Sequence, residues 1–583
     1  MIHNPADPVL LAHGLLQDPG AVPLVIAVAG HRDPRPEYVP LLRYNTRLQL
    51  EQLMKELPHT PLLMLNGMAA GVDTEIAEEF LAVVTAQRLR TASTKLLPSH
   101  QLVATLPKTP EDFAGDFDDD ISRQRCRSLL QRADAVLHPG NCRELIIPPL
   151  PEGQTPSETD PTPYAQQGVF VARHSYLMLA YYDGIDTNLI GGTAHVVMIQ
   201  RQEIYPLFLD VAEVAASGEP AALICHATPR LKHPIPRHQP GEIRYWSLHG
   251  HQGEWRTIDP TIPESLLELP RQLEAINMKV VDPQLIPVVR QEGRYTRLCS
   301  ALEHEATALK TSHIRWIRVF IALGFALVMV AELLEGKPWF GVAVLALLAS
   351  LGWLPRFQQT SKKQLIENRS LIECLAVQYL WSALGVKLDA ADLFQVRNHT
   401  QLRLARLMLR AVKTQLLALN GADRRPIAEA LPQARIWMEG QVQFLSNKIR
   451  VFRQYDARCY LAAWVMGGAA AAIGFAQLIP AAPAQLYLGS IALLAASASV
   501  YAYGELIGFQ ETANRYQRSL EHFKRCIWAF DLPNSKEINT TGTNRVDPWL
   551  HQRIVIEAIG REKIDELNDW ISDQIRRIYR PGG

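Results

Sequence analysis

The sequence predicts an α/β fold with a doubly wound parallel sheet in its N-terminal part, followed by an α-helical membrane domain with four transmembrane helices in two hairpins. Three observations predict this arrangement. Apolar strands alternate with helical patterns across residues 21–200, no charged side chain occurs from Cys459 to Gly504, and a second pair of apolar segments begins near Val319. Strand–helix alternation is typical of parallel sheets, and long uncharged segments are typical of membrane spans.

The overall composition excludes several classes of protein. Lysine plus arginine and aspartate plus glutamate each number 59 in the 583 residues, so the net charge is zero and no nucleic-acid partner is expected. Hydrophobic residues make up 48%, which excludes a mostly disordered chain. The mean hydropathy of −0.04 argues against a transporter with many spans. The seven cysteines have no CxxC spacing, so we expect reduced thiols in the cytosol rather than a disulfide framework.

The apolar segments form two pairs. The first pair is Val319–Leu334 and Pro338–Pro355, and the second lies inside Cys459–Gly504, where Ile479–Pro483 divides it. Each half of the second pair has about 20 residues, enough to cross a hydrocarbon core of about 30 Å. A buried hairpin in a soluble protein is the alternative, chiefly for the first pair, because its first segment is short.

The distribution of lysine and arginine predicts the orientation of these segments. Both residue types are frequent in the long flanks, whereas the two short turns contain only Lys337. By the positive-inside rule, residues 1–315, 356–458 and 510–583 then lie in the cytosol. Small residues recur at helical spacing in the second pair, which favours close packing within or between subunits, so we expect a homo-oligomer. These small residues are Gly467, Gly468, Ala471, Ala472, Gly474, Gly489, Ala492, Ala496 and Ser499.

The N-terminal part begins its strand–helix alternation with Leu24–Ala29, an almost wholly apolar run of the kind that forms a parallel strand buried on both faces. We expect further strands at residues 61–65, 101–106, 135–137, 176–182 and 203–209. We expect helices at residues 36–57, 74–88, 122–133, 166–175 and 193–200. The proline-rich residues 148–163 are expected to form a surface loop.

Three glycine-bearing turns follow strands of this predicted sheet. They are Gly30–Asp33, Asn66–Asp73 and Gly191–Thr193. In doubly wound sheets ligands bind at the carboxyl ends of the strands, and the helix that follows each turn offers free N–H groups to a phosphate. In this arrangement Arg32 is suited to pair with a phosphate and Asp73 to bind a sugar hydroxyl.

These turns, together with Tyr182-Asp183-Gly184, resemble the SLOG superfamily, which includes the DNA-processing protein A fold and the LONELY GUY nucleotide hydrolases. The resemblance covers about residues 21–210, and its most specific part is the Gly-Met-Ala-x-Gly-Val-Asp element that begins at Gly67. It implies a Rossmann-like domain that binds a nucleotide or a nucleotide-derived signal. The ligand-binding residues that it implies are Gly30, His31, Arg32, Asp33, Asn66, Gly67, Met68, Ala69, Gly71, Asp73, Asp183, Gly184, Gly191, Gly192 and Thr193.

The C-terminal half resembles, more loosely, the SLATT class of two-transmembrane effector domains that accompany SLOG sensors. The stretch Glu367–Trp381 is similar to the helix that follows a SLATT hairpin. Four spans rather than two depart from that pattern, which leaves open one module with an extension or two modules. The expected organisation is an extension at 1–20, a SLOG-like domain at 21–295, a linker helix and first hairpin at 296–355, a cytosolic helical region at 356–458, a second hairpin at 459–509 and a cytosolic helical tail at 510–583.

The two resemblances imply a membrane effector of bacterial antiphage defence. Its cytosolic domain would bind a nucleotide-derived second messenger, and its helices would then form a pore or disrupt the inner membrane. We expect a multi-pass protein with cytoplasmic termini, in contact with membrane lipid, that needs no cofactor beyond its signalling ligand. Two alternatives remain: an ion channel whose cytosolic domain is like that of melastatin-type TRP channels, and a membrane-tethered nucleotide hydrolase.

The sequence gives little support for catalysis or for a metal. A LONELY GUY hydrolase has a glutamate three residues after the threonine of its phosphate loop, whereas Thr193 is followed at that spacing by Val196. Glu75, Glu78 and Glu79 are expected to form a solvated helix face. The histidines between residues 225 and 251 match no zinc spacing, so we expect no metal site.

Overall fold

The computed structural model describes most of the chain. The described residues are 20–91, 98–146, 160–187, 189–201, 203–204, 222–232, 237–249, 252–281, 296–334, 337, 339–393, 403–420, 427–477, 485–532 and 549–579. The chain forms two compact units that interleave along the sequence. Of the described residues, the first unit contains those up to Ala301 together with Cys374–Ala430, and the second contains Leu302–Glu373 together with those from Leu431 onward. Each unit is described by itself below.

The first unit is built on one sheet of eight strands in the order β4-β3-β2-β1-β5-β6-β7-β8. The strands from β4 to β6 are parallel, and β7 and β8 continue the sheet antiparallel to β6. The bounds are β1 (Leu24–Gly30), β2 (Leu62–Asn66), β3 (Gln101–Thr105), β4 (Ala135–Leu137), β5 (Leu177–Tyr182), β6 (Ala222–Ala227), β7 (Ile243–His249) and β8 (Gln252–Ile258). The predicted mostly parallel sheet is therefore confirmed.

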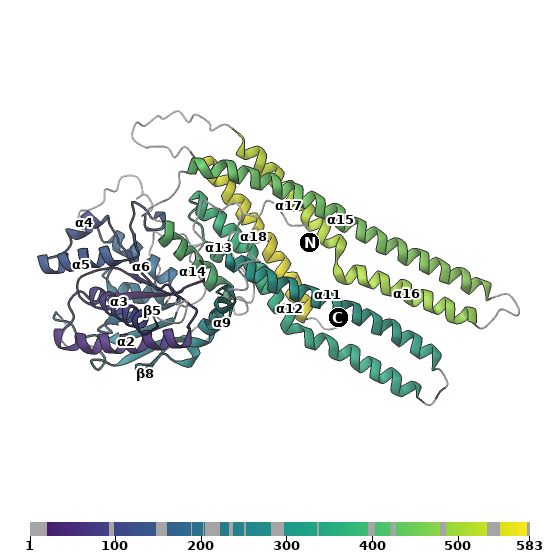
Figure 1. Cartoon of the computed structure of the whole chain (residues 1–583), viewed down its shortest axis with the longest axis horizontal. Coiled ribbons are helices and arrows are strands. Elements are labelled where there is room, and N and C mark those ends of the chain that lie inside the picture. The colour runs from purple at the N-terminus through teal and green to yellow at the C-terminus, as the bar shows by residue number, and fades with distance from the viewer. Residues whose placement is uncertain are drawn as a thin grey trace. The chain divides into compact units, whose positions relative to one another are not determined.

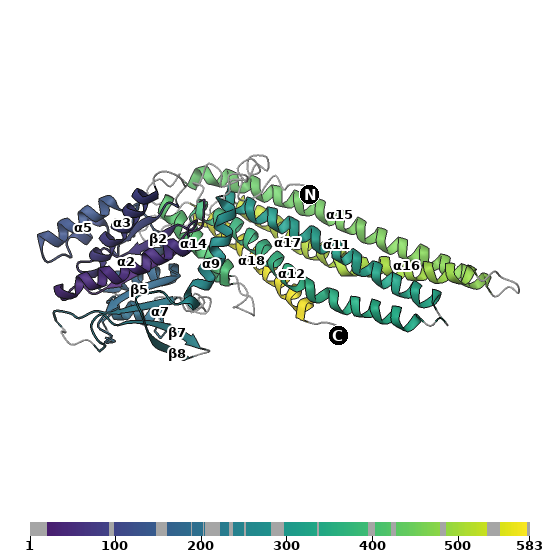
Figure 2. The same cartoon turned by 60° about the horizontal axis from the view of Figure 1, so that its bottom comes forward.

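Helices cover both faces of the parallel part of this sheet (Figures 1 and 2). Leu24, Ile26 and Val28 of β1 join one core with α2, α3 and α5. The alternate residues Val25 and Ala27 are buried as well, and because successive side chains point to opposite faces they lie on the side where α6 and α7 contact β1. The bounds are α2 (Val39–Glu56), α3 (Val72–Thr91), α4 (Pro110–Ala114), α5 (Asp120–Arg132), α6 (Thr162–His174), α7 (Thr193–Gln200) and α9 (Glu264–Val280), with short 3₁₀ turns at Pro36–Tyr38 and Arg143–Leu145.

The sheet departs from expectation in its last strands. The strand expected at 203–209 lies mainly outside the described residues, and the strand that pairs with β5 is β6, at Ala222–Ala227. The antiparallel hairpin of β7 and β8 was not expected. Most of the expected surface loop at 148–163 also lies outside the described residues.

Two further helices, α13 (Ala390–Leu393) and α14 (Arg403–Asn420), belong to the same unit as the sheet, and α14 contacts β4, α6 and α9. Polar side chains make this packing specific. Asp392 of α13 pairs with Arg173 at the end of α6 and with Arg410 of α14, the latter at 3.2 Å. His174 lies 3.0 Å from the Thr414 hydroxyl, and its burial lowers its pKa, so this histidine is neutral.

The second unit consists of long helices. Their bounds are α11 (Arg297–Leu333), α12 (Phe340–Leu384), α15 (Ile427–Ala476), α16 (Gln485–Ile507), α17 (Phe509–Phe530) and α18 (Leu550–Tyr579). Parts of α11, α12 and α15 belong to the first unit. Three helical stretches are long and apolar enough to cross a membrane: Arg297–Leu333, Ala428–Ala476 and Leu486–Phe530. In α12, the counterpart of the expected span Pro338–Pro355, the apolar helix within the described residues is shorter, at Phe340–Ala349. Membrane-type helices are thus present, whereas the expected number of four is not shown.

The α15–α16 hairpin is held by small residues, as the sequence predicted (Figure 1). Ser490 donates a 2.9 Å hydrogen bond to the carbonyl oxygen of Ala470, and Ser497 donates one of 2.6 Å to that of Ala463. A Cβ atom on Gly467 would lie 3.3 Å from the Ser497 hydroxyl, so the two backbones approach closely there. These small faces pack against each other within one chain.

Candidate functional site

The order of the strands places the candidate site between β1 and β5. The chain moves outward from β1 through β2 and β3 to β4, and then returns to pair β5 with the other side of β1. The loops after β1 and β5 therefore leave the sheet in opposite directions, and doubly wound sheets bind ligands at such a point, outside the carboxyl ends of the strands. His31 and Arg32 follow β1, and Asp183 and Gly184 follow β5.

The loop between β2 and α3 packs directly on the loop after β1. Gly71 has a φ of +87°, and a Cβ atom there would lie 2.4 Å from the carbonyl oxygen of Arg32. The Val72 amide donates a 3.1 Å hydrogen bond to the carbonyl oxygen of His31. Only glycine tolerates both this φ and this approach, so Gly71 fixes the first two predicted turns against each other.

The same loop is shaped by Asn66 and by a left-handed residue, Met68, with a φ of 54°. The Met68 amide donates a 2.7 Å hydrogen bond to Oδ1 of Asn66, and Nδ2 of Asn66 donates to the carbonyl oxygen of Asp73 at 2.9 Å. Met68 is fully buried and Ala69 is partly buried. Asn66 and Met68 therefore set the course of the backbone rather than presenting side chains to solvent.

The Asp73 carboxylate lies beneath two of the predicted glycines. Cβ atoms on Gly30 and Gly67 would each lie 3.0 Å from one of its oxygens. Burial raises the pKa of Asp73 to about 7, although nearby amides of Ala69 and Gly30 oppose this shift. Its Oδ1 atom is buried and has no hydrogen-bond partner within the described part of the chain. Asp73 is thus enclosed between the turns, not set on an open surface as a sugar-binding role would suggest.

His31 is also directed into the protein. The Asp183 amide donates a 3.1 Å hydrogen bond to Nε2 of His31, and the Asp183 carboxylate lies 3.4 Å from the same atom. Burial lowers the pKa of His31, which favours the neutral ring that can accept this bond. This geometry indicates that His31 shapes the loop rather than contacting a phosphate.

Arg230 joins the β1 and β5 loops on their other side. Its Nε atom donates a 2.7 Å hydrogen bond to Asp33, and its guanidinium lies 3.9 Å from the Asp183 carboxylate. Gly184 has a φ of +79° and closely approaches His238. The sequence did not predict a role for Arg230, because Arg230 follows β6 and the last strand was expected at residues 203–209.

The third predicted turn lies at the start of α7. The Thr193 hydroxyl donates a 2.9 Å hydrogen bond to the carbonyl oxygen of Gly30. Gly192 is the N-cap and provides no side-chain hydrogen bond, so the first amides of α7 have no side-chain cap. Gly191, with a φ of +76°, lies against Tyr164. A helix start of this kind is suited to an anion.

Two cations and an aromatic ring lie near the same edge. The Arg32 guanidinium is 5.4 Å from the centre of the Tyr164 ring, and Lys108 Nζ is 5.6 Å from it. Lys108 also donates a 2.8 Å hydrogen bond to Asp116, and the Tyr164 hydroxyl donates to the same carboxylate. Arg32 itself is exposed, as a phosphate-binding side chain should be. Lys108 follows β3 and was therefore discoverable from the sequence, whereas Tyr164 enters only through the folding of α6.

The acidic face of α3 is not simply solvated, contrary to expectation. Glu79 has a side chain only 1% exposed, and it pairs with Arg43 and Arg47 of α2. Glu75 and Glu78 pair with Arg43 and with Arg125 of α5. These glutamates hold three helices together.

No group of three or more potential metal ligands occurs among the residues that the structure describes. His226, one of the histidines noted in the sequence, is fully buried and lies 3.1 Å from the Gln49 side chain. His233 and His251 lie outside the described residues.

The structure defines a doubly wound, mostly parallel sheet in a chain that also has helices long and apolar enough to cross a membrane. No protein-family model, no curated protein and no solved structure matches the chain.

Proposed function

We propose that the protein is a membrane effector whose SLOG-like sheet binds a nucleotide-derived second messenger at the carboxyl ends of β1 and β5. The observation that carries this proposal is the meeting of three loops outside the carboxyl ends of β1 and β5. It brings together the exposed Arg32, the uncapped start of α7 and a β1 loop held in place by Gly71. An arginine beside free helix amides recognises phosphate, and glycine turns let a ligand approach the backbone.

Binding without turnover is supported by the position of Val196. A LONELY GUY hydrolase would place a glutamate there, but Val196 is only 6% exposed and packs against Gly168. Asp73 is enclosed, and Nε2 of His31 accepts a hydrogen bond from the Asp183 amide. The arrangement therefore favours a sensor over the membrane-tethered hydrolase.

A route from the site toward the apolar helices begins within the first unit. Tyr164 stands beside Arg32 at the start of α6, and Arg173 at the end of α6 pairs with Asp392 of α13. α13 follows α12, which begins with an apolar segment and runs without interruption from Phe340 to Leu384. We propose that ligand binding shifts this contact and thereby the membrane helices, in a homo-oligomer of the inner membrane that acts in antiphage defence.

The experiment is a thermal-shift screen of the full-length protein in detergent against cyclic di- and trinucleotides, ADP-ribose, cyclic ADP-ribose isomers and AMP. A ligand at 100 times its dissociation constant stabilises the folded state by about 2.7 kcal/mol, which is readily measured. Arg32→Ala should abolish the shift. Arg35→Ala, three residues away and paired with Glu37, should preserve it. A shift that is equal in wild type and Arg32→Ala would place the ligand elsewhere.

The competing channel function has its own signature. A channel whose sheet is only an assembly platform would conduct ions in bilayers without ligand, and Arg32→Ala would leave that conductance unchanged. A hydrolase would release base or phosphate from AMP, which chromatography of the same samples detects.

A further inference from the structure

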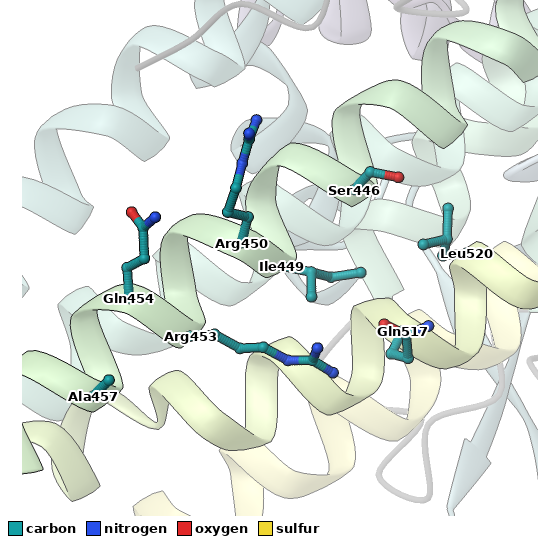
Figure 3. A pocket seen from close by; sticks show the side chains of 8 residues that line it. All are labelled: Ser446, Ile449, Arg450, Arg453, Gln454, Ala457, Gln517 and Leu520. Carbon is teal, nitrogen blue, oxygen red and sulfur yellow. The ribbon is translucent and has the colours of Figure 1, made fainter.

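A shallow groove between α15 and α17 combines exposed cations with an apolar floor (Figure 3). Arg453 extends from α15 toward Gln517 of α17, and Ile449 and Leu520 form buried surface between the two helices. The remaining lining residues are Ser446, Arg450, Gln454 and Ala457.

The cations of this groove are not neutralised by neighbouring carboxylates. Within the described part of the chain Arg453 forms no ion pair or hydrogen bond, and Arg450 donates only to the Asn447 side chain, at 2.5 Å. Gln517 donates a 3.0 Å hydrogen bond to the Glu521 carboxylate on the same helix. Exposed arginines without carboxylate partners on a helix pair are available to an external anion.

The position of the groove along α15 identifies the kind of anion. The charge-free stretch begins at Cys459, so Arg453 lies about 9 Å before it along the helix. The polar headgroup layer adds about 5–8 Å on each side of the hydrocarbon core, so the Arg453 backbone lies at its outer margin and the long side chain can reach a headgroup phosphate. Exposed aromatic side chains, which are frequent at membrane interfaces, lie near the same end of the charge-free stretch. Tyr455 lies before Cys459 and stacks on Phe509 with ring centres 5.7 Å apart, and Tyr460 and Trp464 lie after Cys459.

From this placement we propose that the groove binds the headgroup of an anionic phospholipid. Arg453 and Gln517, which lie toward each other, hold the phosphate, and the acyl chains run past Ala457 along the apolar part of α15. Arg450 and Gln454, whose side chains extend away from Gln517 in Figure 3, add polar groups at the rim. The site rests on the proposed insertion of α15 in the membrane, but not on any nucleotide ligand. It would fix the depth of α15 and α17 relative to the bilayer surface.

The test uses full-length protein purified in detergent, with native mass spectrometry after addition of phosphatidylglycerol or phosphatidylcholine at equal concentrations. Wild type should retain phosphatidylglycerol in preference to phosphatidylcholine. Arg453→Gln should lower phosphatidylglycerol occupancy about fivefold. Arg518→Gln removes the same charge from an exposed position on α17 outside the groove, and it should bind like wild type.

Several outcomes would overturn the assignment. Equal retention of the two lipids by wild type would show that the groove does not select an anionic lipid. Equal losses of phosphatidylglycerol in Arg453→Gln and Arg518→Gln would show the same. Displacement of phosphatidylglycerol by millimolar glycerol phosphate would assign the groove to a soluble phosphate instead. Recovery of the chain from the soluble fraction of cells would overturn membrane insertion as well, whereas a failed nucleotide screen leaves the lipid result intact. Matching thermal midpoints for the two variants exclude misfolding, because neither side chain is buried.

Discussion

The Thr193 hydroxyl donates a hydrogen bond of 2.9 Å to the carbonyl oxygen of Gly30, across 163 residues of sequence. This bond joins the start of α7 to the end of β1, so it connects the glycine turns Gly30–Asp33 and Gly191–Thr193 directly. The remaining turn, Asn66–Asp73, is held to the same strand end by Gly71 and Val72. The candidate site therefore has a backbone frame that exists before any ligand arrives.

Replacing Thr193 by valine should loosen this frame. The change keeps the shape but removes the hydroxyl, so we expect about 1 kcal/mol less stability and weaker binding of any ligand found in the screen. Thr193→Ser restores the donor and should recover both properties. Thermal midpoints with and without ligand measure the effect, and a valine variant that matches wild type in both would show that the bond has no role.

Asp73 should make stability depend on pH. Its pKa is about 7 in the folded protein against 3.8 ordinarily, so the folded state binds the proton more tightly. The stabilisation is fully present below about pH 3.8 and is lost as the pH rises through about 7, with an upper limit of roughly 4 kcal/mol.

Asp73→Asn should flatten this dependence, because the amide cannot ionise. Thermal midpoints between pH 4.5 and 8 would show the effect, and Asp259→Asn, at an exposed position, should behave like wild type. An unchanged slope in Asp73→Asn would mean that another group titrates.

The register of α15 and α16 predicts a new disulfide. A Cβ atom on Gly504 would lie 3.5 Å from Cβ of Cys459, within the range of disulfide-bonded cysteines. Gly504→Cys should therefore cross-link to Cys459 under mild oxidation, as peptide mass spectrometry would detect. Gly489→Cys, with no atom within 4 Å of its Cβ, should not form the bond. Cross-linking by neither variant, or by both equally, would contradict the register.

The pairing of Asp392 with Arg173 and Arg410 should matter for the proposed signal. Asp392→Ala leaves two largely buried cations without their shared carboxylate, which we expect to cost about 3 kcal/mol locally. Faster hydrogen exchange in α14, with ligand binding retained and membrane activity lost, is the expected result. Glu439→Gln removes an exposed partner of Arg435 and should have little effect. Normal membrane activity in Asp392→Ala would exclude this route.

The strands and turns up to β5 were predictable because each has a local signal. Leu24–Ala29 is continuously apolar. Gly71 is a glycine at a position with a positive φ, so the residue type itself indicates the turn. The region after α7 was not predictable in the same way, since β7 and β8 contain Arg244, Arg256 and Glu254 and have no continuous apolar run.

Long-range pairing explains the site residues that sequence reasoning missed or misjudged. Arg230 reaches Asp33 across 197 residues, and Tyr164 meets Arg32 only when α6 crosses the sheet. Asp73 was expected on the turn after β2 and lies in the first turn of α3, and its enclosure depends on two glycines from different loops. Such contacts depend on tertiary packing, and no local sequence pattern indicates them.

The interleaving of the two units limits how this protein can be cut or recombined. A fragment that ends before α11 would lack α14, which contacts β4, α6 and α9 and carries buried Met408, Leu409 and Val412. It would present that apolar contact surface to water and tend to aggregate. A soluble version should instead keep Cys374–Ala430 and replace Leu302–Glu373 by a short linker. For the same reason, exchange of the sensor between related proteins by one crossover would separate the sheet from the helices that complete its core.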